Sequence, residues 1–300
     1  MELRQVEYFV AVASEMSFTR AAERVHVVQS ALSSSIAKLE RELQVQLFDR
    51  SRQQIRLTAA GERFRTHANE VLRVARTAAD SVSEFRGSLS GTVEFGSLIS
   101  FGPMDVARAL GEFHSTNPFV RLKLRLSQSG ASAYLSALLD GSLDLALVSV
   151  PNRFPPQLDM QLLFEEPMVF VCRDDHGLAG RKRLRLSDLA GEELVSYPPE
   201  FGLRRLIDDA FHAVGVKPQT FYEVPAGFAD IADLVVNGLG TTFMPESEAR
   251  RFSALRSVEL SAPVIWQVYL ASPPAGQLTP ATARLASVLL EAAPHPVDRR

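Results

Sequence analysis

Residues 17–58 read SFTRAAERVHVVQSALSSSIAKLERELQVQLFDRSRQQIRLT, and this stretch decides the fold of the amino-terminal part of the chain. Behind Ser17, a residue type that favours helix starts, apolar residues recur at helical spacing up to Val25. After a break at 26–28, apolar residues recur from Leu32 to Leu43 at steps of four, three and four. Two short amphipathic helices joined by about four residues are typical of a helix-turn-helix, whose second helix can lie in the major groove of DNA.

The second helix is predicted to turn short polar side chains and one cation away from its leucines. The apolar runs 45–48 and 55–57 flank a basic, polar segment, which indicates a β-hairpin able to press on the phosphate backbone. The alternative is a packed helical pair in an enzyme, with a solvated polar face, but the order of capped helix, turn, polar helix and basic hairpin favours DNA. We predict phosphate contacts from Lys38, Arg50 and Arg52, base contacts from Gln29, Ser33, Ser34 and Gln54, and further DNA contacts from Ser17, Thr19, Ser30 and Gln53.

A set of short motifs is spread over residues 1–61. These motifs are FVAVA at 9–13, SFTRAA at 17–22, LEREL at 39–43, QLFDR at 46–50 and LTAAG at 57–61. Together they resemble the amino-terminal module of LysR-type transcriptional regulators. The chain has Val28, Ser30 and Ser34-Ser35 where that family usually has Ser, Pro and often Arg-Gln, so a long cation that reads bases is missing at 34.

Composition sets the class of protein. A length of 300 residues with 46% apolar and 22% charged residues suits two or three globular domains. No stretch approaches the roughly 18 apolar residues of a membrane span, and the first residues lack the pattern of a secretory signal. The single cysteine, Cys172, excludes an intrachain disulfide, and we expect a buried thiol and a cytoplasmic protein. Residues 1–90 hold 13 Lys and Arg against 11 Asp and Glu, so DNA affinity must come from local placement of charge.

Residues 59–86 are predicted to form one long helix that Thr58 caps. Small and apolar residues recur along it at alternating steps of four and three, which is the pattern of a coiled-coil seam. We predict self-association through this seam rather than packing on the helix's own domain, and the resemblance implies a dimer and a tetramer built from two dimers. The seam residues are Phe64, Ala68, Val71, Ala75, Ala78, Val82 and Phe85.

Beyond the hinge-like segment 87–91, strands alternate with helices, which predicts parallel-rich α/β sheets. The resemblance implies two lobes like those of periplasmic solute-binding proteins, with crossings near 162–165 and 265–267. The predicted domains are a winged helix-turn-helix at 1–58, a dimerising linker helix at 59–87 and an effector-binding domain at 88–300. Within that domain, lobe one covers about 92–162 and 268–293, and lobe two covers about 163–267.

A small-molecule site is predicted where strands end and helices begin, because ligands of open α/β sheets collect there. Hydroxyl and amide groups in two loops favour an anion, and aromatic rings in two others favour an apolar body, so the effector is predicted to be a small carboxylate. For any single one of these residues, the alternative to ligand binding is helix capping or core packing. Arg204 either clamps a carboxylate or is solvated. The predicted effector residues are Ser97, Ser100, Phe101, Ser127, Gln128, Ser129, Tyr197, Phe201, Gly202, Arg204 and Phe228.

No catalytic constellation is visible in the sequence. The six histidines are scattered without metal-ligand spacing, GSLSG at 87–91 lacks the spacing of a nucleophile elbow, and GLG at 238–240 lacks the third glycine of a dinucleotide fingerprint. We therefore expect a ligand-controlled, DNA-binding transcriptional regulator with no cofactor, no metal and no membrane partner. The rival readings are a small-molecule binding protein outside transcription and an α/β enzyme with a dimerisation helix.

Overall fold

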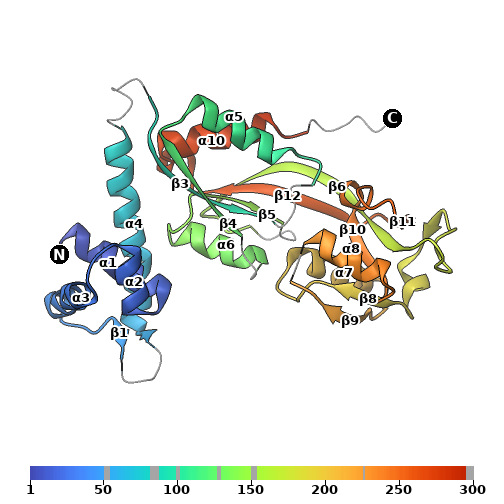
Figure 1. The fold of residues 1–300 in the computed structure, drawn as a ribbon, viewed down its shortest axis with the longest axis horizontal. Helices are drawn as coiled ribbons and strands as arrows, with labels where there is room; N and C mark the ends of the chain where they lie inside the picture. The colour runs from blue at the N-terminus through green and yellow to red at the C-terminus, as the bar shows by residue number, and fades with distance from the viewer. Residues whose placement is uncertain are drawn as a thin grey trace. The chain divides into compact units, whose positions relative to one another are not determined.

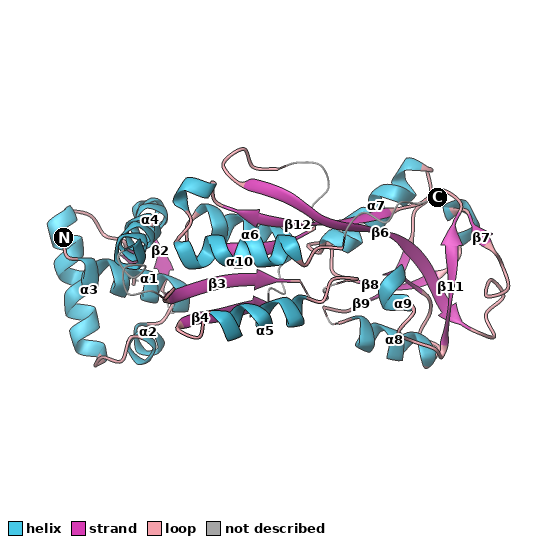
Figure 2. Cartoon of the chain, turned by 90° about the horizontal axis from the view of Figure 1, so that it is seen from above, coloured by secondary structure: helices cyan, strands magenta, loops and turns pink. Residues whose placement is uncertain are grey.

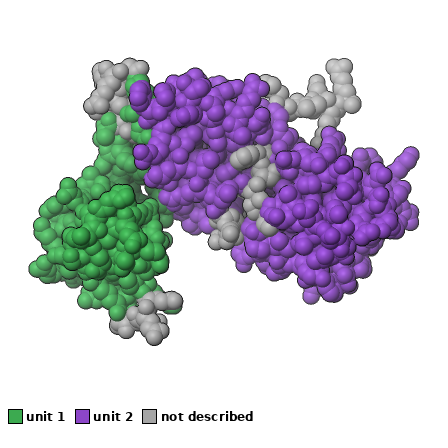
Figure 3. Space-filling model, viewed as in Figure 1, with its two compact units in different colours: residues 1–91, 139–142 green, residues 92–138, 143–300 purple. Residues whose placement is uncertain are grey.

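The computed structural model of the chain describes residues 1–50, 55–81, 88–98, 102–126, 130–149, 154–225 and 227–294. The chain divides into two compact units, one of residues 1–91 with 139–142 and one of residues 92–138 with 143–300 (Figure 3). Among the described residues, none of the helices combines the length and the apolar character that a membrane span requires.

The first unit is the predicted winged helix-turn-helix followed by a long helix. Its elements are α1 (Leu3–Glu15), α2 (Phe18–Arg24), α3 (Gln29–Leu43), β1 (Phe48–Asp49), β2 (Arg56–Leu57) and α4 (Ala59–Ser81). The Ser17 hydroxyl accepts a hydrogen bond from the Arg20 amide (3.3 Å) and caps α2 as expected. β1 and β2 pair antiparallel with Phe48 opposite Leu57, so the hairpin is confirmed. The predicted DNA contacts Arg52, Gln53 and Gln54 lie outside the described residues.

Aromatic rings join the three helices to the hairpin and to α4. The Phe9 ring lies 5.2 Å from the Phe48 ring and 4.8 Å from the Phe64 ring, centroid to centroid. The Thr58 hydroxyl accepts from the Gly61 amide (3.0 Å) and so caps α4, as predicted. A Cβ at Gly61 would lie 2.1 Å from the Leu47 carbonyl oxygen, so only glycine lets the hairpin cross the first turn of α4 this closely.

The predicted seam of α4 divides between two environments. Ala68 is buried in the core of its own unit, and Phe64 packs against that core through Phe9. The prediction that Ala68 faces a neighbouring chain is therefore wrong, because α1 packs on the first half of α4 and buries this residue (Figure 1). Phe64 is half-buried. Val71 and Ala78 are exposed and Ala75 is half-buried. Val82 and Phe85 lie outside the described residues.

The second unit is a two-lobed α/β domain. Its strands are β3 (Gly91–Ser97), β4 (Val120–Leu126), β5 (Leu145–Val148), β6 (Asp159–Arg173), β7 (Arg183–Leu184), β8 (Glu193–Ser196), β9 (Gln219–Glu223), β10 (Thr242–Pro245), β11 (Leu255–Leu260) and β12 (Ile265–Ser272). Its helices are α5 (Val106–Thr116), α6 (Gly130–Leu139), α7 (Gly202–Ala213), α8 (Phe228–Val236), α9 (Glu246–Ala249) and α10 (Pro280–Glu291). In lobe one, α5 and α10 lie on one side of the strands and α6 on the other (Figure 1).

Two long strands connect the lobes. β6 pairs with β12 as far as Pro167, which lies opposite Ile265, and from Met168 onward it pairs with β10 and β11 (Figure 2). All these pairs are antiparallel, whereas β3–β5, β7–β11 and β8–β9 are parallel. The expectation of parallel-rich sheets is thus wrong at the crossing, because a chain that passes between lobes on one strand and returns on its neighbour must run antiparallel.

Candidate nucleic-acid interface and ligand pocket

The polar flank of α3 is exposed and its apolar flank is buried. Gln29, Ser30, Ser34 and Lys38 are exposed and Ser33 is half-buried, while Leu32, Ile36 and Leu39 are fully covered. Thr19 on α2 is also exposed, and Ser17 is half-buried at its cap. The side chains predicted to contact DNA on α3 therefore share one accessible surface.

Lys38 and Arg50, two of the cations that we predict to contact phosphates, have different surroundings. Lys38 Nζ lies 3.1 Å from Glu2 Oε1, and because both side chains are exposed this ion pair is weak. The hydrogen bond from Lys38 lowers the pKa of the Glu2 carboxyl.

Arg50 is held more firmly. Its guanidinium lies 3.1 Å from Glu40 Oε2 and 4.7 Å from the Phe18 ring centre. The other oxygen of Glu40 accepts from the amides of Leu47 and Phe48, at 2.8 and 3.1 Å. Arg50 therefore ties the hairpin to α3, a structural role that the spacing of the sequence did not indicate.

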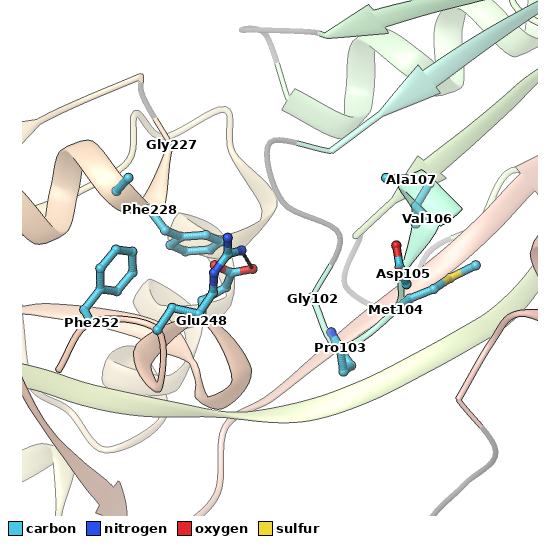
Figure 4. Close-up of a pocket in the computed structure, with 12 residues that line it drawn as sticks. Gly102, Pro103, Met104, Asp105, Val106, Ala107, Gly227, Phe228, Glu248 and Phe252 are labelled. Carbon is cyan, nitrogen blue, oxygen red and sulfur yellow. Dashed lines mark hydrogen bonds and ion pairs between the residues drawn. The ribbon is translucent and has the colours of Figure 1, made fainter. Parts of the chain in front are cut away.

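A cavity of about 740 Å³ opens between the lobes of the second unit. One wall is the segment Gly102–Ala107 that leads into α5, and the other is formed by residues of lobe two (Figure 4). The lobe-two residues are Gly227, Phe228, Ala229, Glu248, Arg251 and Phe252.

The charged groups of the cavity are partly engaged. Asp105 caps α5 by accepting from the Arg108 amide (2.9 Å). Glu248 is buried, and its Oε2 lies 3.3 Å from Nη1 of Arg251, whose side chain is 71% exposed. The Phe228 and Phe252 rings lie on the same side of the cavity as Glu248 (Figure 4). The wall thus presents an accessible guanidinium beside aromatic surface.

A buried cluster of side chains on β6 and β12 lies beside the cavity. Glu166 on β6 accepts from the amide and the hydroxyl of Ser247, each at 2.9 Å, and burial raises the pKa of its carboxyl. Opposite it on β12 lies Trp266, which is 2% exposed and meets Phe164 edge to face at 5.5 Å. A Cβ at Gly102 would lie 2.7 Å from the Phe164 ring and 3.1 Å from Glu166 Oε1, so the cavity wall rests directly on this cluster.

The predicted effector residues are only partly brought together. Phe228 lines the cavity, and the Tyr197 ring behind it stacks on Phe201 at 5.5 Å and meets Phe228 edge to face at 5.8 Å. Arg204 is largely buried, and its guanidinium is taken up by Asp208 (2.7 Å) and Glu223 (3.0 Å). The sequence left two alternatives for Arg204, a carboxylate clamp or a solvated residue. The solvated alternative is wrong, because the Arg204 guanidinium is buried against two carboxylates of the protein itself.

The remaining predicted effector residues lie elsewhere. Ser97 is buried and donates its hydroxyl to the Leu98 carbonyl (3.3 Å). At Gly202 a Cβ would lie 2.3 Å from the Ser149 carbonyl oxygen, so glycine permits a close approach between the lobes. The serines and neighbours that lie outside the described residues are Ser100, Phe101, Ser127, Gln128 and Ser129.

The single thiol of the chain is buried. Cys172 on β6 is fully buried, and burial raises its pKa to about 11. Since the thiolate is the form that reacts with oxidants, this cysteine lacks the character of a redox sensor.

Comparison with known proteins assigns the family. Residues 3–62 match the bacterial regulatory helix-turn-helix model of the lysR family, and residues 86–294 match the LysR substrate binding domain. The chain belongs to the LysR family. It is therefore a transcriptional regulator with a helix-turn-helix and an effector-binding domain, and not an enzyme.

Relatives of this LysR-type regulator cover most of its length. It is 30% identical over 263 residues to an uncharacterised HTH-type transcriptional regulator, YybE of Bacillus subtilis, covering 88% of this chain and 89% of that one. It is 31% identical over 245 residues to a hydrogen peroxide-inducible genes activator of Pectobacterium carotovorum, covering 82% and 80%. A full-length OxyR variant of Pseudomonas aeruginosa superposes with a TM-score of 0.75 at 24% identity, covering 98% and 94%, which shows the shared fold.

Proposed function

We propose that this LysR-type regulator places α3 in the major groove of its operator and sets two such modules apart by pairing of α4 between protomers. The accessible polar flank of α3 supports the first part, and the exposed side chains of Val71 and Ala78 on α4 support the second. The protein would act on DNA in the cytoplasm, as a dimer or a tetramer.

The assignment of cations to phosphates has a direct test. Each lost phosphate contact reduces the slope of log affinity against log salt by about one. We expect Lys38→Ala and Arg52→Ala to weaken binding to all duplex sequences and to reduce this slope. A loss confined to one operator sequence would make the residue a base contact.

We further propose that the cavity between the lobes is the effector site and that its ligand is a small carboxylate with an aromatic body. The observation that carries this proposal is the exposed Arg251 guanidinium beside Phe228 and Phe252 in a cavity of about 740 Å³. A guanidinium pairs with a carboxylate through two parallel hydrogen bonds, and the half-buried Phe252 ring offers apolar surface to the rest of the ligand. Asp105 and Glu248 oppose a ligand of high negative charge, which favours a monocarboxylate.

Trp266 provides the assay for this site. It is the single tryptophan of the chain, and it lies against Phe164, which lies against Gly102 in the cavity wall. Titration of the full-length protein with phenylacetate, phenylalanine and phenethylamine should change Trp266 emission for the carboxylates and not for the amine. Arg251→Ala should remove that response, whereas Arg284→Ala on α10, another exposed arginine, should preserve it.

Two results would contradict the proposal. A response to phenethylamine as strong as that to phenylacetate would reject a carboxylate site. A carboxylate response that survives Arg251→Ala would place the ligand elsewhere in the effector-binding domain.

A further inference from the structure

One apolar side chain stands out on the proposed DNA-binding surface. Val28, directly before α3, is 68% exposed, the highest exposure of any large apolar residue among the described residues 1–50 and 55–81. Ala31, one turn further on, is exposed as well, and Leu32 beside it is fully buried. The start of α3 therefore presents methyl groups outward.

Valine at this position does not stabilise the isolated protein. Val28 occupies the N-cap of α3 and makes no side-chain cap bond, whereas Ser17 caps α2. A serine at an N-cap accepts a backbone hydrogen bond that valine cannot accept. An exposed isopropyl group also gains nothing from burial in the isolated protein. Neither local helix formation nor the core of this unit explains valine at this position.

The neighbouring side chains limit what this end of α3 can recognise. Residues 28–37 contain no lysine or arginine, so no long cation is available for guanine. What they offer a groove is the Gln29 amide, serine hydroxyls and the methyl groups of Val28 and Ala31. In the major groove, the base feature that matches a methyl group is the 5-methyl group of thymine.

We propose that Val28 packs against the 5-methyl group of a thymine in each operator half-site and so contributes to sequence choice. The inference rests on the proposed placement of α3 in the major groove. The N-terminal residues of a recognition helix are the ones that reach base edges, which puts Val28 at the right end of α3. Burial of one methyl group contributes about 0.8 kcal/mol, which corresponds to about fourfold in affinity.

The test uses full-length protein and a duplex site recovered by in vitro selection from random DNA. Each thymine is replaced in turn by deoxyuridine, which keeps the base pair and removes only the 5-methyl group. For the wild-type protein we expect one thymine per half-site at which deoxyuridine weakens binding about fourfold.

Val28→Ser separates lost recognition from lost folding. Serine removes both methyl groups and restores an N-cap, so we expect its melting temperature to equal or exceed that of the wild type. Val28→Ser should bind the thymine-containing duplex about fourfold more weakly than the wild type does. It should bind the thymine-containing and the deoxyuridine-containing duplexes equally well. Val214→Ser, at an exposed valine of the other unit, is the matched control and should keep the wild-type ratio.

The possible results distinguish failure of the Val28 contact from failure of the proposed placement of α3 in the major groove. If Gln29→Ala weakens binding but the wild type discriminates no thymine from deoxyuridine, the Val28 contact is wrong and the groove placement of α3 stands. If Val28→Ser keeps the wild-type ratio at every thymine, another group reads the methyl and the inference is overturned. If neither Gln29→Ala nor Val28→Ser changes affinity or the selected sequence, α3 is not the reading helix and both fall.

Discussion

Replacing Tyr197 by phenylalanine should stabilise the effector-binding domain. The Tyr197 hydroxyl is buried, and in the described part of the chain it has no hydrogen-bond partner. Burial, together with the nearby Glu248 and Asp230 carboxylates, raises its pKa well above the ordinary tyrosine value, so the group stays neutral. Phenylalanine would keep the ring contacts with Phe201 and Phe228 and would lose only the unpaired hydroxyl.

The size of the effect follows from the cost of an unsatisfied polar group. A buried donor without an acceptor costs about 1–3 kcal/mol, and we expect Tyr197→Phe to recover about 1 kcal/mol or more of this. For a unit as large as residues 92–138 with 143–300, each kcal/mol raises the melting temperature by about 2–4 °C. Differential scanning calorimetry of the full-length protein would resolve that shift.

Tyr134 on α6 supplies the matched control. It is equally buried, but its hydroxyl lies 2.6 Å from the Ser97 carbonyl oxygen and 2.8 Å from that of Arg125. Tyr134→Phe removes a satisfied hydrogen bond and should lower stability by about 1 kcal/mol. The same substitution thus has opposite signs at the two sites. A melting temperature lowered by Tyr197→Phe as much as by Tyr134→Phe would refute the reasoning, because it would mean that the Tyr197 hydroxyl has a partner.

Three further outcomes follow from the geometry. The pKa of the Glu166 carboxyl is raised in the folded protein, so its contribution to stability is greatest below the ordinary glutamate pKa and is lost as pH rises through the folded value. Between pH 4 and pH 8, the melting temperature of Glu166→Gln should therefore rise relative to that of the wild type as the pH increases. In urea unfolding, Arg50→Ala should lower the free energy of unfolding by about 1–2 kcal/mol, because it leaves the mostly buried Glu40 without its cation. Lys38→Ala should change the free energy of unfolding by less than about 0.5 kcal/mol. Hydrogen peroxide should leave operator binding unchanged in wild type and in Cys172→Ala, because the thiol is buried with a pKa of about 11; a shift in the wild type alone would show that the thiol reacts.

Local sequence was sufficient where a neighbour along the chain supplies the partner. Ser17 and Thr58 cap helices because the amides they bind lie three residues ahead, and Leu32, Ile36 and Leu39 are buried because their spacing puts them on one face. Strand β4 alternates apolar and charged residues along its whole length, a pattern that local sequence shows directly. β11, and the half of β6 before Met168, lack such a pattern, because polar residues interrupt their apolar runs.

The amino-acid sequence therefore determines the helix-turn-helix, its hairpin, the long helix after it and the serine-rich flank of α3, since each depends on spacing within a few turns. Tertiary structure decides what each face meets. Ala68 has the spacing of a coiled-coil position, yet packing of α1 on α4 buries it within its own unit. Arg251 reaches the cavity only because β6 and β12 bring the segment after α9 close to the segment before α5. Periodicity reports that a face is apolar or polar, and only packing between segments distant in sequence selects its partner.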